Sequence, residues 1–166
     1  MDKFKRLSEL RRIVAAEKAR GRTIVLANGC FDLFHVGHIR YLRAARAKGD
    51  VLVVALNSDS SVRKLKGKRR PILPQKERAE ILASFSFVDY VTVFNQPMVT
   101  RVLLALKPDI HVKGSDYSRE TVPERDTVKA YGGRVAIVGG PKICNTSQVI
   151  QNIAARMRKK ERKGPA

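Results

Sequence analysis

Residues 23–38, TIVLANGCFDLFHVGH, are the stretch that decides the fold. The apolar run that opens it is short and rich in branched side chains, which is typical of a buried strand. Helical spacing begins at Gly37, so His35 and His38 stand where this strand gives way to a helix. Free backbone N–H groups and the positive end of the helix dipole project from such a corner, and Gly37 lets a ligand come close to the backbone. The stretch therefore predicts a phosphate site.

Apolar runs of the same kind recur further along the chain, at residues 51–57, 89–94, 109–114 and 134–139. They are continuous rather than alternating, as in parallel strands that are covered on both faces. Helical patterns lie over 37–48, 74–86, 97–107 and about 121–131, and a last one begins near Asn145. This alternation predicts an α/β fold with right-handed crossovers: a Rossmann-like, doubly wound, five-stranded parallel sheet flanked by helices. Such sheets bind ligands at the carboxyl ends of their strands.

The length of 166 residues and the 43% apolar content suit a single compact unit. The spacing predicts an N-terminal amphipathic helix over residues 1–21, a main domain over 22–156 and a basic, disordered tail over 157–166. No apolar stretch is long enough to cross a membrane and the start lacks a secretory pattern, so we expect a cytoplasmic protein without a membrane partner. Cys30 and Cys144 are expected to be free thiols.

The formal net charge of +19 is concentrated at residues 1–22, 63–78 and 156–163. Such a field attracts polyanions, including nucleic acid and phosphorylated small molecules. The two terminal clusters are expected to be solvated ends that bind nucleic acid at most nonspecifically. A nucleic-acid-binding protein is the non-enzyme alternative, and it is disfavoured because the chain has no Trp, 6% aromatic residues and no recognisable RNA-binding motif.

Two other interpretations of the histidine pair stay open. Asp32, His35 and His38 are spaced three apart and could bind a metal ion, but a dedicated site needs a further ligand and His111 is far away in sequence. The histidines could also merely cap the helix. We predict no metal site and favour phosphate, because the pair brackets a glycine at a strand-to-helix corner.

HVGH in this setting resembles the HxGH signature of the nucleotidyltransferase superfamily, which includes the cytidylyltransferases. Within it, the chain is most similar to the D-glycero-β-D-manno-heptose 1-phosphate adenylyltransferases of lipopolysaccharide core synthesis, which occur alone or fused to a kinase. The similarity covers about residues 22–155, and the segments that carry it are NGCFDLFHVGH, LNSD at 56–59, LKGKRRPI at 65–72, Glu77 with Arg78, VDYV at 88–91 and PDIHVKGSDY at 108–117. It makes residues 22–156 a nucleotidyltransferase domain.

The resemblance implies transfer of AMP from ATP to a sugar 1-phosphate, with release of pyrophosphate and formation of ADP-heptose. Mg²⁺ is implied as the companion of ATP, held mostly by the triphosphate and water. The enzymatic alternatives are a cytidylyltransferase for glycerol 3-phosphate or a similar phosphate ester, and a flavin mononucleotide (FMN) adenylyltransferase. A homodimer is also implied, because relatives commonly form one.

The resemblance further implies a set of catalytic residues. His35 and His38 are expected to donate hydrogen bonds to the phosphates, with Lys66 on a flexible basic loop over 63–70 that closes over the substrates. The residues expected to bind the sugar phosphate are Asp32, Asp59, Lys64, Lys68, Arg78 and Asp116. Asp32 is expected to orient a neighbouring backbone group or histidine, because a phosphate monoester dianion needs no base.

The residues expected to bind the nucleotide follow the strand ends: Asn28, Gly29, Cys30, Phe31, Gly37, Lys113, Asn145, Thr146 and Ser147. One departure concerns the start of the last helix, where the family usually carries Ser-Thr-Thr or Ser-Ser-Thr. This chain has Cys144-Asn145-Thr146-Ser147, which keeps two hydroxyls and a good N-cap residue but replaces the family's hydroxyl at Asn145.

Overall fold

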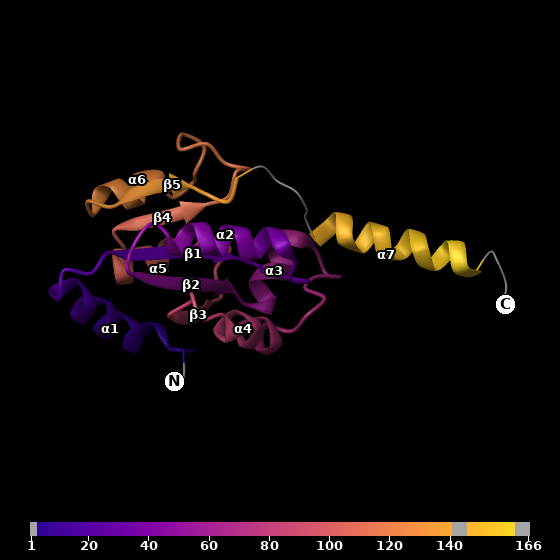
Figure 1. The fold of residues 1–166 in the computed structure, drawn as a ribbon, viewed down its shortest axis with the longest axis horizontal. Helices are drawn as coiled ribbons and strands as arrows, with labels where there is room; N and C mark the ends of the chain where they lie inside the picture. Colours follow the sequence, from indigo (N-terminus) through magenta and orange to yellow (C-terminus); the bar gives the residue numbers. More distant parts are fainter. Residues whose placement is uncertain (1–2, 141–145, 162–166) are drawn as a thin grey trace.

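The computed structural model describes residues 3–140 and 146–161, of which 158–161 by their backbone alone. At its centre lies a sheet formed by β1 (Ile24–Gly29), β2 (Val51–Asn57), β3 (Tyr90–Phe94), β4 (Ile110–Lys113) and β5 (Arg134–Ile137). The strand order is β3-β2-β1-β4-β5 and every neighbouring pair is parallel. The predicted five-stranded, doubly wound α/β sheet is therefore confirmed (Figure 1).

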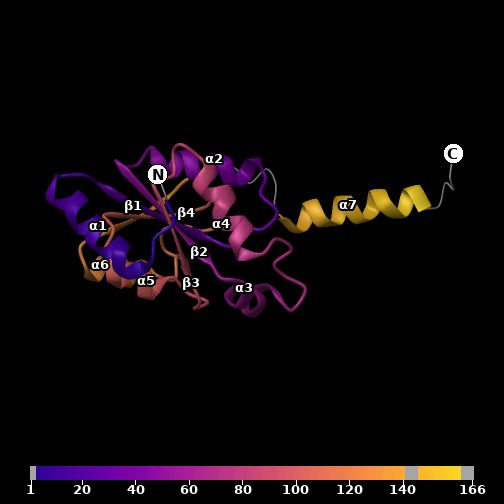
Figure 2. The same ribbon diagram turned by 90° about the horizontal axis from the view of Figure 1, so that it is seen from below.

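Helices cover both faces of this sheet (Figure 2). One face carries α2 (Val36–Arg46) and α4 (Gln75–Ser84), and the other carries α1 (Leu7–Ala19), α5 (Thr100–Leu106) and α6 (Arg125–Ala130). Because both faces of the sheet are buried under helices, the strands are continuous apolar runs and not alternating ones.

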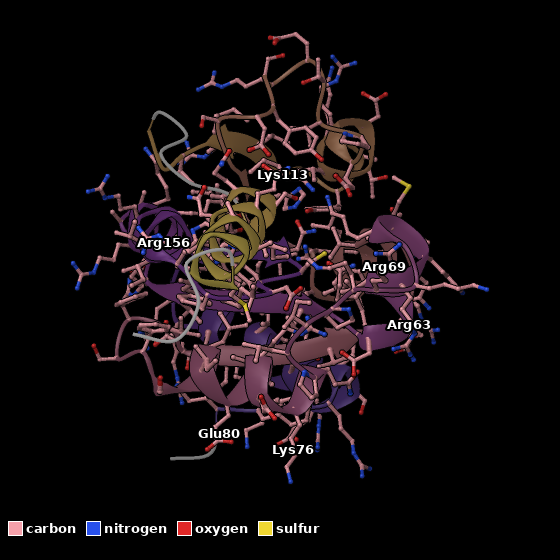
Figure 3. All side chains as sticks on the ribbon, turned by 90° about the vertical axis from the view of Figure 1, so that its right-hand side faces the viewer. Arg63, Arg69, Lys76, Glu80, Lys113 and Arg156 are labelled. Carbon is pink, nitrogen blue, oxygen red and sulfur yellow. The ribbon has the colours of Figure 1, made fainter. Side chains whose placement is uncertain are left out.

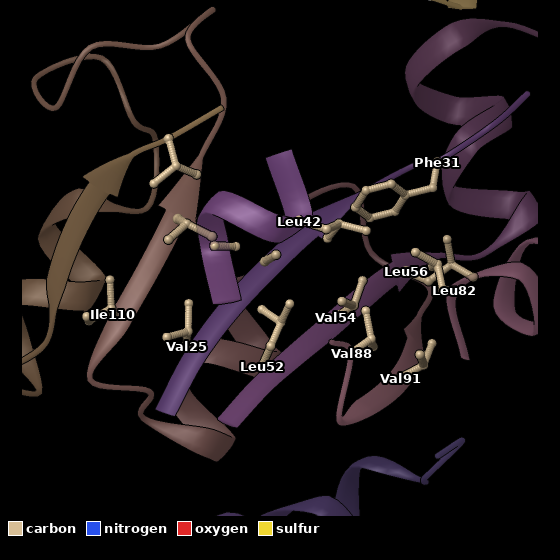
Figure 4. Packing of buried hydrophobic residues seen from close by; sticks show 14 of the residues in the cluster. Val25, Phe31, Leu42, Leu52, Val54, Leu56, Leu82, Val88, Val91 and Ile110 are labelled. Carbon is tan, nitrogen blue, oxygen red and sulfur yellow. The ribbon is translucent and has the colours of Figure 1, made fainter. Parts of the chain in front are cut away.

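Successive strand residues enter opposite cores. Val25 packs with the α2 and α4 side, whereas Leu26 packs with the α1 and α5 side, and neither is exposed. Figure 4 shows the first of these cores, where Leu52 and Val54 of β2 face Leu42 of α2 and Leu82 of α4. Each such side chain contributes roughly 1.5–3 kcal/mol by its burial, which fixes the register of the strands and hence the place where they end.

The strand order defines where a ligand can bind. The chain crosses from β1 to β2 and β3 on one side and returns to β4 and β5 on the other, so the order reverses between β1 and β4. Ligands of open α/β sheets bind outside the carboxyl ends of the strands at such a reversal. His35 and His38 follow β1, and Lys113 ends β4, so the predicted site flanks this point.

The prediction of a flexible loop over 63–70 is wrong for its first half. Residues Asp59–Lys66 form a helix, α3. Its N-cap is Ser58, whose side chain accepts a hydrogen bond from the backbone N–H of Ser61 at 3.2 Å. Basic residues in its last turn interact favourably with the negative end of the helix dipole. Gly67 ends the helix with a φ of 94°. The connection without helical structure is residues 67–74.

The two ends of the described chain differ from the expected boundaries. Phe4 forms a β-bridge with Val91 of β3, and α1 begins only at Leu7. At the other end, α7 (Thr146–Glu161) extends away from the sheet (Figure 1) and runs past residue 157, where the tail was expected to begin. Residues 162–166 lie outside the described part. Within the described ranges, none of the helices is long and apolar enough to cross a membrane.

Candidate active site

His35 and His38 form the predicted corner at the start of α2. His35 is the N-cap residue, and its Nδ1 accepts a hydrogen bond from the backbone N–H of Gly37 at 3.2 Å. Nδ1 of His38 accepts one from the backbone N–H of His35 at 3.4 Å. The two rings stack with their centroids 3.8 Å apart and their planes 22° from parallel. The corner is thus a capping box made of imidazoles.

The hydrogen bonds at Nδ1 fix the tautomer of both rings. A ring nitrogen that accepts a hydrogen bond carries no proton. The ring proton therefore lies on Nε2, which can donate a hydrogen bond to another group. Burial against Phe31 and Phe34, and then the neighbouring His35, lower the pKa of His38 to about 3. His38 is therefore neutral over the physiological range. Capping and ligand binding use different nitrogens of the rings, so the capping interpretation does not compete with a phosphate site.

The turn between β1 and α2 has an unusual backbone. Phe31 and Leu33 both adopt left-handed conformations, with φ of 46° and 43°, which non-glycine residues rarely do. The ring of Phe31 lies in the core beside Phe34 and Tyr41, and the expectation that Phe31 lines the nucleotide site stays a prediction. Gly29 makes room for that ring, because a Cβ atom there would lie 3.2 Å from Phe31 Cε2.

Asp32 holds the backbone that follows α3. Its carboxylate accepts hydrogen bonds from the backbone N–H groups of Ile72 (2.9 Å) and Leu73 (3.0 Å), and from Arg70 Nε at 2.7 Å. Burial alone would raise the pKa of Asp32, but these N–H groups and the charge of Arg70 outweigh it and hold the pKa below its usual value. The expectation that Asp32 orients a backbone group is confirmed. The expected contact with substrate is not what this 1% exposed residue makes.

Arg78 is likewise a structural group and not the expected substrate ligand. It is completely buried, and its guanidinium donates to Leu73 O, Cys30 O and Asn57 O and forms an ion pair with Asp59 at 2.6 Å. These contacts use four of its five N–H donors. Asp59, which was expected to bind the sugar phosphate, begins α3, and its carboxylate pairs with Arg78.

Asn28 lies near the end of β1, and its side chain is fixed by a residue that sequence analysis did not assign to the site. Nε2 of the buried His111, on the adjacent strand β4, lies 3.0 Å from Asn28 Oδ1. Burial, and then the charge of Lys113, lower the pKa of His111 to about 3, so the ring is neutral. Because the neutral ring donates to Oδ1, the amide nitrogen of Asn28 points away from His111.

Lys113 ends β4 as an almost buried cation. Its Nζ lies 3.3 Å from Glu124 Oε2 and 5.2 Å from the ring centroid of Tyr117. The ion contact lacks the alignment of a hydrogen bond, and the two side chains are only 9% and 4% exposed. Asp116 is exposed just after the strand, and its Oδ1 lies close to Gly114, where a Cβ atom would be 2.9 Å away.

The lysines of the basic stretch 63–70 lie on α3 and on the loop after it, which follow β2 in the chain. Lys64, Lys66 and Lys68 are all exposed, and Cys30 at the end of β1 is half-buried. Burial raises the pKa of the Cys30 thiol, and the charges of Lys66, Arg78 and Arg70 act against this rise. Lys66 is therefore close enough to the strand end to act on it electrostatically. Figure 3 views this edge, with Arg63 and Arg69 on one side of α7 and Lys113 above it.

The start of α7 reaches the site from the far end of the chain. Thr146 Oγ1 donates a hydrogen bond to the backbone carbonyl of Asp32 at 2.7 Å, although 114 residues separate them. Ser147 is exposed in the first turn of α7. Asn145, predicted to bind the nucleotide, and Cys144, predicted to be a free thiol, lie outside the described residues.

The arrangement can bind and polarise an anion. Two imidazoles with Nε2–H donors stand at the amino end of α2, and cations occur on α3, on the loop after it and at the end of β4. Over residues 3–140 and 146–161, no cluster of three or more His, Cys, Asp or Glu side chains is placed to hold a metal ion. Asp32 is turned to Arg70 and two backbone N–H groups instead.

Comparisons with known proteins place this chain in a family. A family model described as cytidylyltransferase-like matches residues 26–157. "Bifunctional protein HldE" of Geobacter metallireducens is 50% identical over 91% of this chain, and that of Syntrophotalea carbinolica is 47% identical over 93%. The chain spans 31% of the length of each of these two relatives.

Two solved structures share the fold. The lipopolysaccharide core biosynthesis protein of Thermoplasma volcanium is 31% identical, with a TM-score of 0.61, over 71% of this chain and 95% of that one. Pantoate-beta-alanine ligase of Francisella tularensis has a TM-score of 0.64 at 13% identity over 96% of this chain and 78% of that one, which is a likeness of fold alone. The match of the family model, together with the paired histidines at the start of α2, shows that this chain belongs to the cytidylyltransferase-like family.

Proposed function

We propose that this chain is a nucleotidyltransferase that transfers AMP from MgATP to D-glycero-β-D-manno-heptose 1-phosphate, forming ADP-heptose and pyrophosphate in lipopolysaccharide core synthesis. The observation that carries the proposal is the stacked pair of His35 and His38 at the start of α2, whose Nδ1 atoms accept backbone N–H groups. The choice of heptose rests on the two HldE relatives and on the lipopolysaccharide core biosynthesis protein that shares the fold.

The reaction needs positioning and charge neutralisation rather than a covalent intermediate. A phosphate oxygen of the sugar 1-phosphate attacks the α-phosphorus of ATP, the bond from that phosphorus to the bridging oxygen breaks, and pyrophosphate leaves with the electron pair. The attacking phosphate is already an anion, so no residue has to remove a proton from it. The main obstacle is bringing two anions together.

The histidine pair addresses this obstacle. The Nε2–H groups of His35 and His38 donate to the α-phosphate and to the oxygen that becomes pyrophosphate, where negative charge develops. One such preorganised donor is typically worth about 3–4 kcal/mol in the transition state. Because His38 is neutral, it stabilises the charge by donating a hydrogen bond, without transferring a proton.

The remaining residues bind the substrates around this pair. Lys66 contacts the phosphates, supported by Lys64 and Lys68, and its exposed position at the end of α3 leaves it free to approach them. Asn28, Gly29, Cys30, Gly37, Lys113, Thr146 and Ser147 surround the nucleotide, and Asn145 belongs to the same group by sequence. Asp116 faces the sugar. Mg²⁺ enters as part of MgATP, since the described residues offer it no ligand cluster.

A substrate panel tests the proposal. ATP and CTP are each offered with heptose 1-phosphate, glycerol 3-phosphate and FMN, and pyrophosphate release is measured. We expect the highest kcat/KM for ATP with heptose 1-phosphate. Preference for CTP with glycerol 3-phosphate, or for ATP with FMN, would assign the chain to one of those activities instead. Release by His38→Ala at the parent rate would contradict the site itself.

Three further expectations accompany the function. We propose that the reaction takes place in the cytoplasm, where ATP is available, and that the chain forms a homodimer, which a light-scattering mass checks. Binding of nucleic acid is expected only as a salt-dependent, nonspecific attraction to the basic ends. Removing residues 156–166 should weaken binding of a random oligonucleotide without changing adenylyl transfer.

A further inference from the structure

The lysines proposed to bind phosphate lie on a segment of which few residues are buried. We call residues 59–73, which comprise α3 and the loop after it, the basic segment. Its cations are Arg63, Lys64, Lys66, Lys68, Arg69 and Arg70, and all except Arg70 are exposed. Neighbouring like charges repel one another, and only Ser61 and Val62 of the segment are buried. Something outside it must therefore fix its position.

Arg78 of α4 joins the two ends of this segment. At the first end, its NH2 group pairs with Asp59 at 2.6 Å, and at the second end, its Nε donates to the carbonyl of Leu73 at 2.9 Å. Its NH1 group donates to Asn57 O at the end of β2 and to Cys30 O just after β1. One buried guanidinium thus connects both ends of the basic segment to both strand ends.

Asp32 holds the second end independently. Its carboxylate receives the backbone N–H groups of Ile72 and Leu73 and the side chain of Arg70. Asp32 follows β1 in the same turn as Cys30, so both attachments are made to the rigid frame that carries the histidines. Between the two ends lies Gly67, around which a side chain would meet nothing within 4 Å, so the middle of the segment stays open while its ends are tied.

We propose that Arg78 and Asp32 are positioning residues that clamp both ends of the basic segment and thereby set the place of Lys66 relative to His35 and His38. Neither residue binds substrate. The planar fork of Arg suits this task, because it donates in several fixed directions at once, which a Lys ammonium cannot do with the same geometry. The role of Lys66 rests on the proposed function, whereas the clamp itself does not.

Limited proteolysis tests the clamp without any assay of activity. The basic segment offers trypsin sites after Arg63, Lys64, Lys66, Lys68 and Arg69. In Arg78→Lys, we expect cleavage at these sites to become at least tenfold faster, while cleavage after Lys18 in α1 keeps its rate. Lys76→Ala is the matched control, since it removes an exposed cation from the same helix and should leave both rates within twofold of the parent. Unchanged cleavage of the segment in Arg78→Lys would overturn the proposal.

A double-mutant cycle tests whether the clamp acts through Lys66. We expect Arg78→Lys and Lys66→Ala each to lower kcat/KM for ATP by at least tenfold, and the double variant to be no worse than Lys66→Ala within about threefold. Losses that multiply would mean that Arg78 does not act through Lys66. If Lys66→Ala alone changes nothing, the assigned role of Lys66 fails, while the proteolysis result still decides the clamp.

A second variant covers a failure of Arg78→Lys to fold. Asp59 is partly exposed, so Asp59→Asn removes the charge that pairs with Arg78 and weakens one attachment with less disturbance of the core. We expect it to accelerate cleavage of the basic segment at least threefold, while the midpoint of thermal unfolding stays within a few degrees of that of the parent. No acceleration in a folded Asp59→Asn protein would contradict a clamp at the first end.

Discussion

His35 and His38 lie in stacking contact, 3.8 Å between ring centroids, and each uses Nδ1 to accept a backbone N–H group at the start of α2. The same contact that orders the helix start therefore orients two Nε2–H donors. Structural and chemical roles are carried by opposite nitrogens of the same rings. This separation makes the two roles independently testable.

His35→Asn should separate capping from chemistry. Asn is a good N-cap residue, so we expect the free energy of unfolding to change by less than about 1 kcal/mol. The substitution removes the Nε2–H donor, so kcat should fall about a hundred- to thousandfold. Urea unfolding and the pyrophosphate assay measure the two quantities. A variant that keeps full kcat would reduce His35 to a capping residue.

The pKa of about 3 of His111 predicts acid sensitivity. An unfolded His has a pKa near 6.5, so between about pH 6.5 and pH 3 the unfolded chain binds the proton that the folded chain rejects. Stability should therefore be complete above about pH 6.5 and fall as the pH is lowered through this window. His38 acts in the same direction.

His111→Gln checks this pH dependence, because it keeps a donor for Asn28 Oδ1 but does not titrate. Comparing urea unfolding at pH 7.5, 5.5 and 4.5, we expect the variant to lose less stability than the parent between the first and last values. Parallel losses in both proteins would show that His111 does not carry the acid sensitivity.

The buried pair of Lys113 and Glu124 should tolerate the loss of one partner poorly. Glu124→Gln leaves a nearly buried ammonium without its counter-charge, and we expect a loss of roughly 3 kcal/mol in unfolding free energy. Asp126→Asn is the matched control, since it breaks an ion pair with Arg125 whose side chains are 50% and 84% exposed, and should cost less than about 1 kcal/mol. Equal losses of unfolding free energy in the two variants would contradict a larger contribution from the buried pair.

Much of the fold could be predicted from the sequence because its signals are local. Each strand is a continuous apolar run, and the change of period at Gly37 marks the start of a helix within two residues of its place in the structure. The position of His35 and His38 relative to β1 followed from adjacency alone. No long-range contact was needed to place them.

The errors fall where the partners are far apart in sequence. Arg78 sits in a basic cluster and resembles an exposed phosphate ligand, but its acceptors come from residues 30, 57, 59 and 73. Helix α3 was missed because DSSVRKLK has only two large apolar residues, and its stability comes from the Ser58 cap and from Arg78. His111 could have been found by noting that β4 lies beside β1, which the reversal of strand order requires.

The hydroxyl group of Thr146 links the last helix to the turn that contains Asp32. Thr146→Val removes the hydrogen bond to the Asp32 carbonyl but keeps the shape of the side chain. A typical hydrogen bond contributes about 1 kcal/mol, so we expect KM for ATP to rise about fivefold, with kcat nearly unchanged. Thr146→Ser keeps the hydroxyl and should restore the parent KM. If Ser and Val raise KM equally, the methyl group and not the hydroxyl positions the start of α7 at the site.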